Sequence, residues 1–225
     1  MSQKTIAFVD SGKGGLPYFD FFRARNPGVN AVYAADTEHF PYGKKTKAEL
    51  VAILCSLVET LKSRYAPAVI ALVCNTASVS SLSELRAAFP DILFVGTVPA
   101  VKPAVESSAS GVIGVIGTER TLDDPYIDTI AEAAGKPCRI ERAAAPELVE
   151  FVEHRLETAT AQERIAQVLP YIQQFRTQKV DALVLGCTHF LLLKQDFVEA
   201  GTPDMKIFDS VEGVTKQIER LITDT

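Results

Sequence analysis

The sequence contains no tryptophan, only two methionines, and four cysteines that form no C-x-x-C pair. Because Cys55, Cys74, Cys138 and Cys187 are widely separated, the local ligand pairs that structural zinc sites use are missing. We therefore expect no metal site. In a reducing compartment we expect all four cysteines to be free thiols.

Long hydrophobic runs and clusters of like charge are also missing. No run of about 18 apolar residues is present, so we expect no membrane-spanning helix. The formal net charge is −5 at pH 7 with no basic block, which argues against nucleic acid or membrane surfaces as partners. The first residues, MSQKTIAFVDSG, lack a signal-peptide pattern. These absences predict a cytoplasmic protein.

What the sequence does have is a regular alternation of apolar runs and amphipathic segments. Hydrophobic residues make up 47% of the 225 residues, which permits a substantial core. Continuous Val, Ile, Leu and Ala runs are typical of strands buried on both faces of a parallel sheet. Alternation of such runs with helices predicts an α/β fold with mostly parallel sheets. The expected strands are 5–9, 29–35, 68–73, 92–96, 111–117, 181–186 and 206–208.

Two helices are expected with particular clarity. The first begins at Thr46 and runs to about residue 64, because Thr46 and Glu49 form a T-x-x-E capping box. Its apolar residues recur at spacings of three and four, which gives one apolar face. The second is expected at about 160–177, where Pro170 should kink or divide it.

Two distant segments resemble each other. Residues 69–73 and 180–184 both read V-x-A-L-V, and a cysteine follows each of them. The repetition predicts two pseudo-symmetric domains, although a chance likeness between two α/β strands is the alternative.

We expect the first domain to comprise residues 1–97 and 206–225, and the second to comprise 98–205. The segment 96–111, which is rich in Pro, Ser and Ala, is the expected linker.

Polar residues stand at the carboxyl ends of the expected strands, where ligands bind in open α/β sheets. Cys74 and Cys187 each lie between a strand and an expected helix start, where the helix dipole favours the thiolate. A buried, inert thiol is the alternative for each, and it is our interpretation of Cys55; Cys138 has no assigned role. The converging residues are Asp10, Ser11, Cys74, Asn75, Thr76, Thr118, Cys187, Thr188 and His189.

Other motifs are less specific. The loop DSGKGG (10–15) matches neither a dinucleotide fingerprint nor a phosphate-binding P-loop, so it is either a tight strand–helix turn or a turn that also approaches a carboxylate. His189 could share a proton with Cys187 or hold a carboxylate. His39 and His154 are interpreted as loop or surface residues.

Seven sequence blocks, in the same order along the chain, resemble the glutamate racemases within the wider aspartate/glutamate racemase group. The combination of DSG, PYG, CNT and CTH is more specific than any one motif. The blocks are FVDSGKGGL (8–16), DTEHFPYGKKT (36–46), CNTAS (74–78), VPAVKPAV (98–105), GVIGVIGT (111–118), LGCTHF (185–190) and FDS (208–210).

The resemblance implies a racemase that needs no cofactor and interconverts L- and D-glutamate, with D-glutamate supplying peptidoglycan synthesis. It also implies two α/β domains with the active site in the cleft between them, and a homodimer. By matching position, the catalytic residues are Cys74 and Cys187 as acid/base thiols, with Asp10, His189 and Glu153. The implied substrate-binding residues are Asp10, Ser11, Tyr42, Gly43, Asn75, Thr76, Thr118, Thr121, Thr188 and His189.

Chemistry agrees with this resemblance, because racemisation needs acid/base groups on opposite faces of the substrate. No lysine motif indicates pyridoxal phosphate, so hydrogen bonds must stabilise the carbanion. The alternatives are a racemase of another acidic amino acid such as aspartate, a non-catalytic amino-acid-binding protein, and a one-cysteine decarboxylase or isomerase. Two cysteines argue against the last two.

Overall fold

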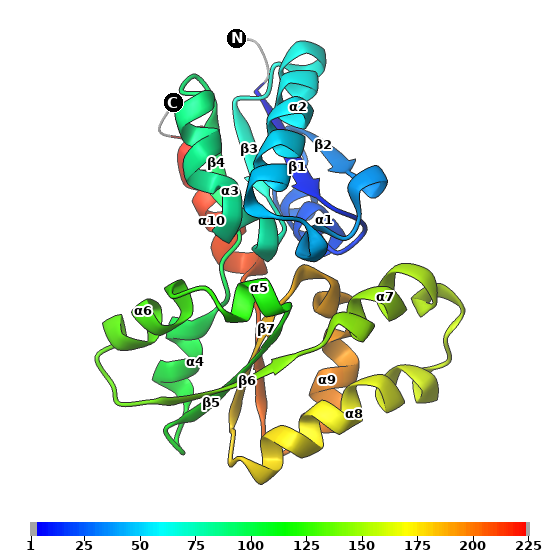
Figure 1. The fold of residues 1–225 in the computed structure, drawn as a ribbon, viewed down its shortest axis with the longest axis vertical. Helices are drawn as coiled ribbons and strands as arrows, with labels where there is room; N and C mark the ends of the chain where they lie inside the picture. Colours follow the sequence, from blue (N-terminus) through cyan, green and yellow to red (C-terminus); the bar gives the residue numbers. More distant parts are fainter. Residues whose placement is uncertain (1–3, 224–225) are drawn as a thin grey trace. The chain divides into compact units, whose positions relative to one another are not determined.

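The computed structural model describes residues 4–223. This part of the chain forms two compact units, one running up to Val98 and resuming at Ser210, the other spanning Pro99–Asp209. Each unit contains a four-stranded parallel sheet with helices packed around it (Figure 1). The predicted fold class, two α/β domains with parallel sheets, is therefore confirmed.

The first unit has the strand order β2-β1-β3-β4. Its central strands β1 and β3 are wholly buried, as their continuous apolar sequences require. The elements are β1 (Thr5–Asp10), α1 (Leu16–Arg25), β2 (Asn30–Ala35), η1 (Thr37–His39), η2 (Tyr42–Lys44), α2 (Lys47–Tyr65), β3 (Val69–Leu72), α3 (Asn75–Ala88), β4 (Leu93–Gly96) and α10 (Val211–Thr223), where η marks a 3₁₀ helix.

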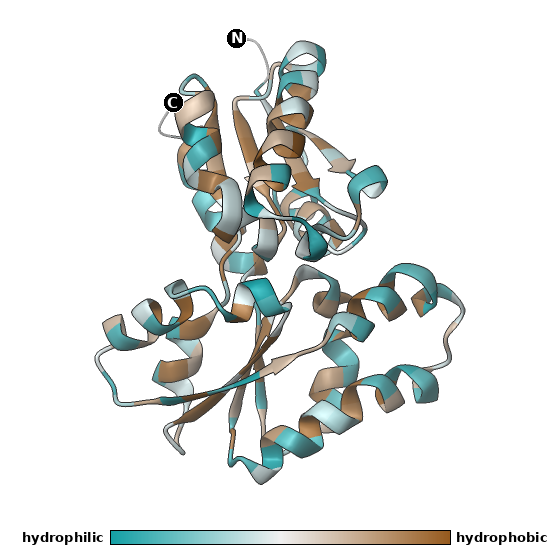
Figure 2. Ribbon diagram, viewed as in Figure 1, coloured by the Kyte–Doolittle hydropathy of each residue, from teal (hydrophilic) through white to brown (hydrophobic). Residues whose placement is uncertain are grey.

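The second unit repeats this topology with the order β6-β5-β7-β8. Figure 2 shows the same hydropathy division in both units, with brown strands inside and teal residues on the outer helix faces. The elements are α4 (Val101–Ser107), β5 (Val112–Gly117), α5 (Glu119–Leu122), α6 (Tyr126–Ala133), β6 (Arg139–Ala144), α7 (Pro146–His154), η3 (Leu156–Thr158), α8 (Ala161–Thr177), β7 (Ala182–Gly186), η4 (Thr188–Leu193), α9 (Lys194–Gly201) and β8 (Lys206–Phe208).

The two sheet orders match strand for strand. β1 corresponds to β5, β2 to β6, β3 to β7 and β4 to β8, in both cases with parallel neighbours. The similar segments near 69–73 and 180–184 are therefore the equivalent strands β3 and β7. This equivalence favours two similar halves over a chance likeness.

The two predicted helices are confirmed. Thr46 caps α2 through the full capping box with Glu49, and Thr160 caps α8 in the same way through Glu163. Pro170 neither divides α8 nor ends it, because the helix is continuous from Ala161 to Thr177.

Three sequence-based expectations are corrected. Residues 206–208 form β8, which pairs with β7, so the chain returns to the first unit only at Ser210. The expected linker 96–111 instead contains α4, which buries Val101, Ala104 and Val105 in the second core at helical spacing. Strand β6 was not expected at all, because its sequence RIERAA carries charges where the other strands are apolar.

The loop between α4 and β5 is held by one carboxylate. Asp181 accepts hydrogen bonds from the Ser108 hydroxyl (2.6 Å) and from the backbone N–H groups of Ala109 and Ser110 (both 2.7 Å). Partial burial acts to raise the pKa of Asp181, but these donors outweigh it and leave the pKa below its ordinary value.

Candidate active site

The glycine loop after β1 is a close-packed turn. Asp10 is fully buried, and its Oδ1 accepts a hydrogen bond from the N–H of Gly12 at 2.8 Å. A Cβ on Gly15 would lie 2.5 Å from Val73, so only glycine fits there. The Tyr33 hydroxyl donates to the Gly12 carbonyl (2.7 Å) and accepts from the Gly15 N–H (3.1 Å). The loop therefore orders Asp10 and Ser11 at the end of β1.

Cys74 is the residue that precedes α3, directly beyond β3. Its backbone is extended (φ −142°, ψ 119°), and its side chain is 7% exposed. Ser78 fixes this junction, because its hydroxyl contacts the carbonyls of Leu72 and Cys74 and accepts the N–H of Thr97 at 2.9 Å. The thiol is thus held at the N-terminus of a helix of 14 residues.

Asn75 is the most informative side chain of the first unit. It is 3% exposed, yet neither Oδ1 nor Nδ2 has a hydrogen-bond partner. Leaving a buried polar group unpaired costs about 1–3 kcal/mol, so native structures rarely contain one without a reason. A ligand with both donor and acceptor groups would satisfy this amide. Thr76, the next residue, is also buried.

Tyr42 belongs to the same region through Asp36. The Tyr42 hydroxyl donates to Asp36 Oδ2 at 2.7 Å, and His39 Nδ1 lies 2.8 Å from Asp36 Oδ1. Burial, then the hydrogen bond and charge of Asp36, then the charges of Cys74 and Asp10 raise the pKa of Tyr42 far above its ordinary value. Tyr42 is therefore a neutral phenol whose hydroxyl group donates its hydrogen bond to Asp36.

Cys187 occupies the equivalent position in the second unit, directly beyond β7. Its backbone is again extended (φ −137°, ψ 135°), and its side chain is again 7% exposed. Unlike Cys74, it precedes a 3₁₀ helix of six residues and not an α-helix. We therefore expect the helix dipole to stabilise a thiolate less at Cys187 than at Cys74. Thr188 and His189, which follow, are buried.

His189 contacts Glu153 across two elements. The distance from His189 Nε2 to Glu153 Oε2 is 3.0 Å, and the two side chains are 3% and 12% exposed. Glu153 lies on α7, which packs against η4. A half-buried carboxylate at this distance fixes the orientation of the imidazole ring.

Thr118 and Thr121 lie beyond β5, which is the strand equivalent to β1. Their hydroxyl oxygens are 3.1 Å apart, and Thr121 is 1% exposed. The close approach of β5 and β7 depends on glycine, since a Cβ on Gly186 would lie 3.0 Å from the Ile116 carbonyl. Thr118 therefore follows β5 as Ser11 follows β1, and Thr121 lies three residues further along, in α5.

Within each unit, the expected site residues gather at the carboxyl ends of the strands. Gly43 differs from the others because it is exposed. Sequence reasoning did not select Asp36 as a candidate, although its position directly after β2 is the same signal that selected Asp10. His39 was interpreted as a loop or surface residue; its side chain is 39% exposed, and its Nδ1 lies 2.8 Å from Asp36 Oδ1.

The other two cysteines lie elsewhere. Cys55 lies within α2, and Cys138 lies beside β6; both are partly exposed free thiols. Across residues 4–223, no three His, Cys, Asp or Glu side chains are grouped so as to hold a metal ion. No helix in the same range is long and apolar enough to span a membrane.

The two units have equivalent sheets, and in each a buried cysteine with small polar residues comes directly after the matching strand, β3 or β7. These features define a two-domain α/β protein with one such thiol in each domain. Residues 22–218 match the Asp/Glu/Hydantoin racemase family. The chain is 41% identical to the glutamate racemase of Sphingopyxis alaskensis over 218 residues, which cover 96% of this chain and 81% of that protein.

Comparison with solved structures gives the same result as the sequence comparisons. The chain is similar to the Escherichia coli glutamate racemase, crystallised with L-glutamate and the activator UDP-MurNAc-Ala, with a TM-score of 0.87 and 33% identity over 98% of this chain and 83% of that one. The Pyrococcus horikoshii aspartate racemase homologue PH1733 has a TM-score of 0.61 at 17% identity, over 98% and 99% of the two chains, which shows the shared fold alone. The chain belongs to the Asp/Glu/Hydantoin racemase family, and it is an amino-acid racemase, an isomerase.

Proposed function

We propose that this racemase interconverts L- and D-glutamate without a cofactor, using Cys74 and Cys187 as opposed acid and base. The observation that carries the proposal is the equivalent placement of the two thiols, each 7% exposed and each directly beyond the matching strand. An inert structural thiol has no reason to recur at the same position of both sheets.

The reaction is two proton transfers. One cysteine, as thiolate, removes the α-proton, so that the Cα–H bond breaks, an S–H bond forms and the electron pair remains on Cα. The other cysteine, as thiol, then delivers its proton to the opposite face of Cα and becomes the thiolate. The roles reverse for the other enantiomer.

Hydrogen-bond donors must stabilise the carbanion, since the sequence lacks a lysine motif for pyridoxal phosphate. The unsatisfied Asn75 amide is the best-supported donor, and Ser11, Thr76 and Thr188 join it. Their preorganised dipoles stabilise negative charge that develops at the α-carboxylate. Thr118 and Thr121 complete the set on the second unit.

The charged residues assist the thiols. Asp10, fully buried at the end of β1, is placed to orient the substrate ammonium or a thiol proton. His189, oriented by Glu153 at 3.0 Å, stands two residues after Cys187 and supports proton exchange at that thiol. Tyr42 and Gly43 contribute to the substrate pocket beside Cys74.

Glutamate is the favoured substrate because the similar Sphingopyxis protein is named a glutamate racemase and the Escherichia structure holds L-glutamate. Aspartate is the alternative, since the wider family includes aspartate racemases. We further propose that the enzyme works in the cytoplasm and supplies D-glutamate for peptidoglycan.

The test is to incubate the purified protein with L-glutamate or L-aspartate, without added cofactor, and to follow optical rotation. Loss of rotation with L-glutamate is expected, and it should persist after dialysis against a chelator. Racemisation of L-aspartate alone would replace the substrate assignment. Turnover that needs added metal or pyridoxal phosphate would contradict the two-thiol chemistry.

A further inference from the structure

A tyrosine on a neighbouring strand holds the glycine loop. Tyr33 lies in β2, which pairs with β1, and it stands 21 residues after Gly12 and 18 residues after Gly15. Its hydroxyl donates to the Gly12 carbonyl at 2.7 Å and accepts from the Gly15 N–H at 3.1 Å. A tyrosine hydroxyl can donate and accept at once, and here it does both. One side chain therefore connects the two ends of the loop.

Aromatic packing fixes the position of this hydroxyl. Phe8 of β1 is the register partner of Tyr33, so the two side chains lie on the same face of the sheet. The ring centroid of Phe19, in α1, lies 5.6 Å from that of Phe8 and 5.6 Å from that of Tyr33. Such distances are typical of aromatic pairs that stabilise each other. The ring of Tyr33 is thus held by its neighbours, and exchange to phenylalanine removes the hydroxyl alone.

Gly12 connects Tyr33 with the candidate active site. The Gly12 carbonyl accepts from Tyr33, and the Gly12 N–H donates to Asp10 Oδ1 at 2.8 Å. Glycine has the least restricted backbone of all residues, so the peptide groups on either side of Gly12 need external partners to keep one orientation. Because Asp10 is fully buried, the direction of its carboxylate depends on this N–H. A change at Tyr33 is therefore transmitted to Asp10 through a single residue.

We propose that Tyr33 is a positioning residue for the racemisation, whose hydroxyl fixes Gly12 and through it the carboxylate of Asp10. This role rests on the proposed function, in which Asp10 orients the substrate ammonium or a thiol proton. Tyr33 itself transfers no proton and is assigned no contact with the substrate. Its hydroxyl keeps the carboxylate in the geometry of the reacting complex, and such preorganisation acts on the chemical step more than on substrate binding.

A purely structural role of the same hydroxyl is the alternative. Its two hydrogen bonds to the loop also stabilise the folded state. If they did nothing more, loss of the hydroxyl would lower the thermal stability, and kcat of the folded protein would stay unchanged. The separate effects on kcat and KM, measured on folded protein, therefore distinguish the two roles.

The first test compares Tyr33→Phe with the wild type in the racemisation of L-glutamate, followed by optical rotation. We expect kcat to fall about 10- to 100-fold and KM to change less than about threefold, because a displacement of about 1 Å in a positioned group can cost 10²-fold in rate. Far-ultraviolet circular dichroism at the assay temperature shows that each variant is folded. A folded variant with the wild-type kcat would overturn the proposal, and so would a rise in KM alone.

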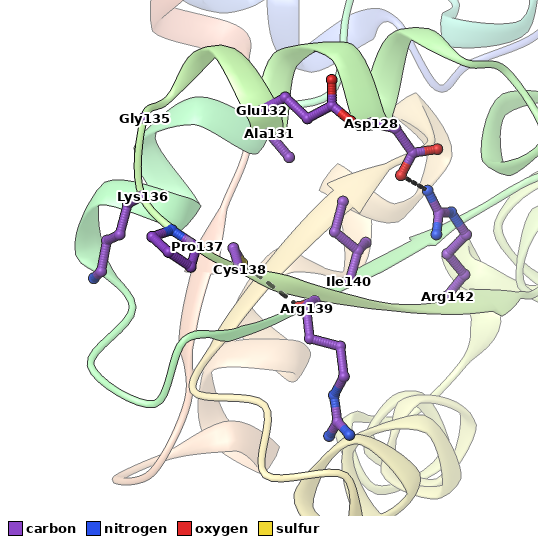
Figure 3. A pocket seen from close by; sticks show the side chains of 10 residues that line it. All are labelled: Asp128, Ala131, Glu132, Gly135, Lys136, Pro137, Cys138, Arg139, Ile140 and Arg142. Atoms are coloured by element: carbon purple, nitrogen blue, oxygen red, sulfur yellow. Dashed lines mark hydrogen bonds and ion pairs between the residues drawn. The ribbon is translucent and has the colours of Figure 1, made fainter.

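Two control variants test whether any lost contact has this effect. Tyr18→Phe makes the same chemical change in the same unit, where the Tyr18 hydroxyl lies 2.9 Å from Ser210 Oγ. Asp128→Asn breaks the 2.6 Å ion pair with Arg142 beside a cavity of about 730 Å³ between α6 and β6 (Figure 3). No residue that lines this cavity belongs to the candidate active site. Both variants should keep the wild-type kcat; a loss in either as large as that of Tyr33→Phe would contradict the positioning role.

The second test is a double-mutant cycle with Asp10. Asp10→Asn removes the carboxylate and keeps the volume of the side chain. If Tyr33 acts by placing this carboxylate, Tyr33→Phe should change kcat less than about twofold in the Asp10→Asn background. Effects that multiply would mean that Tyr33 acts independently of Asp10, and the proposed route through Gly12 would be wrong.

The wild-type assay separates this proposal from the proposed function. A wild type that racemises L-glutamate, together with a Tyr33→Phe variant of equal kcat, overturns the positioning role alone. A wild type that converts no L-glutamate overturns both, since the positioning role depends on that reaction.

Discussion

Replacing Asn75 with alanine should make the protein more stable and a poorer catalyst. Asn75 is 3% exposed, and neither polar atom of its side chain has a partner. Removing a buried, unpaired polar group recovers about 1–3 kcal/mol, and the small void that remains cancels part of this gain. We expect about 1 kcal/mol of net stabilisation, or a rise in Tm of about 3 °C.

The catalytic loss follows from the same amide. A hydrogen bond to a charged group contributes about 1.5–3 kcal/mol, so its loss should lower kcat/KM about 10- to 150-fold. Thermal denaturation followed by circular dichroism measures the first effect, and optical rotation with L-glutamate measures the second.

Ser78→Ala is the matched control on the same helix. The Ser78 hydroxyl contacts the Leu72 and Cys74 carbonyls and accepts the Thr97 N–H. Its removal leaves the Thr97 N–H without this partner and should destabilise the protein by about 1–2 kcal/mol. The reasoning fails if Asn75→Ala is destabilising and leaves kcat/KM unchanged, because the amide would then have a structural role.

Three further predictions concern single side chains. Cys187→Ala should reduce turnover about 10²–10⁴-fold, whereas Cys55→Ala should leave it nearly intact; equal rates would remove the thiol assignment. Glu153→Gln should lower kcat more than it raises KM and should alter the pH profile of kcat, because His189 loses its carboxylate partner; a change in KM alone would point to substrate contact instead. Asp181→Asn should destabilise the protein at neutral pH, and the difference from wild type should vanish in acid. The lowered pKa of Asp181 gives stability that is present above the ordinary value of about 3.9 and is lost as the pH falls through the folded-state pKa. Unfolding curves at pH 7 and below pH 3 test this, and a constant difference would contradict it.

The central strands could be predicted because burial on both faces demands continuous apolar sequence, as in β1 and β3. β6 could not, because only part of an edge strand is buried and its sequence RIERAA resembles a polar turn or helix. The segment 96–111 was wrongly interpreted as a linker for a different reason. Pro103 and its neighbours suggest a linker, but proline is tolerated in the first turn of a helix, and α4 begins at Val101.

The positions of the thiols and Asn75 directly beyond β3 and β7 were predictable because continuous apolar runs mark where those buried strands end. The contact between Glu153 and His189 joins residues 36 positions apart, and no local pattern indicates it; the family resemblance named both residues but not their contact. The Asp36–Tyr42 contact depends on the path of the intervening loop, which the sequence does not determine.

The most direct test of the two-thiol account is solvent isotope incorporation. In D₂O the donating thiol carries deuterium, so D-glutamate formed from L-glutamate should gain one solvent deuterium in nearly every turnover. The remaining L-glutamate should stay mostly protiated early in the reaction, because the abstracting thiol can return its own proton. Mass spectrometry of the separated enantiomers at low conversion measures both pools. Substantial protium at Cα of the D-glutamate would mean that one group serves both faces, and Cys74 and Cys187 would then not be opposed acid and base.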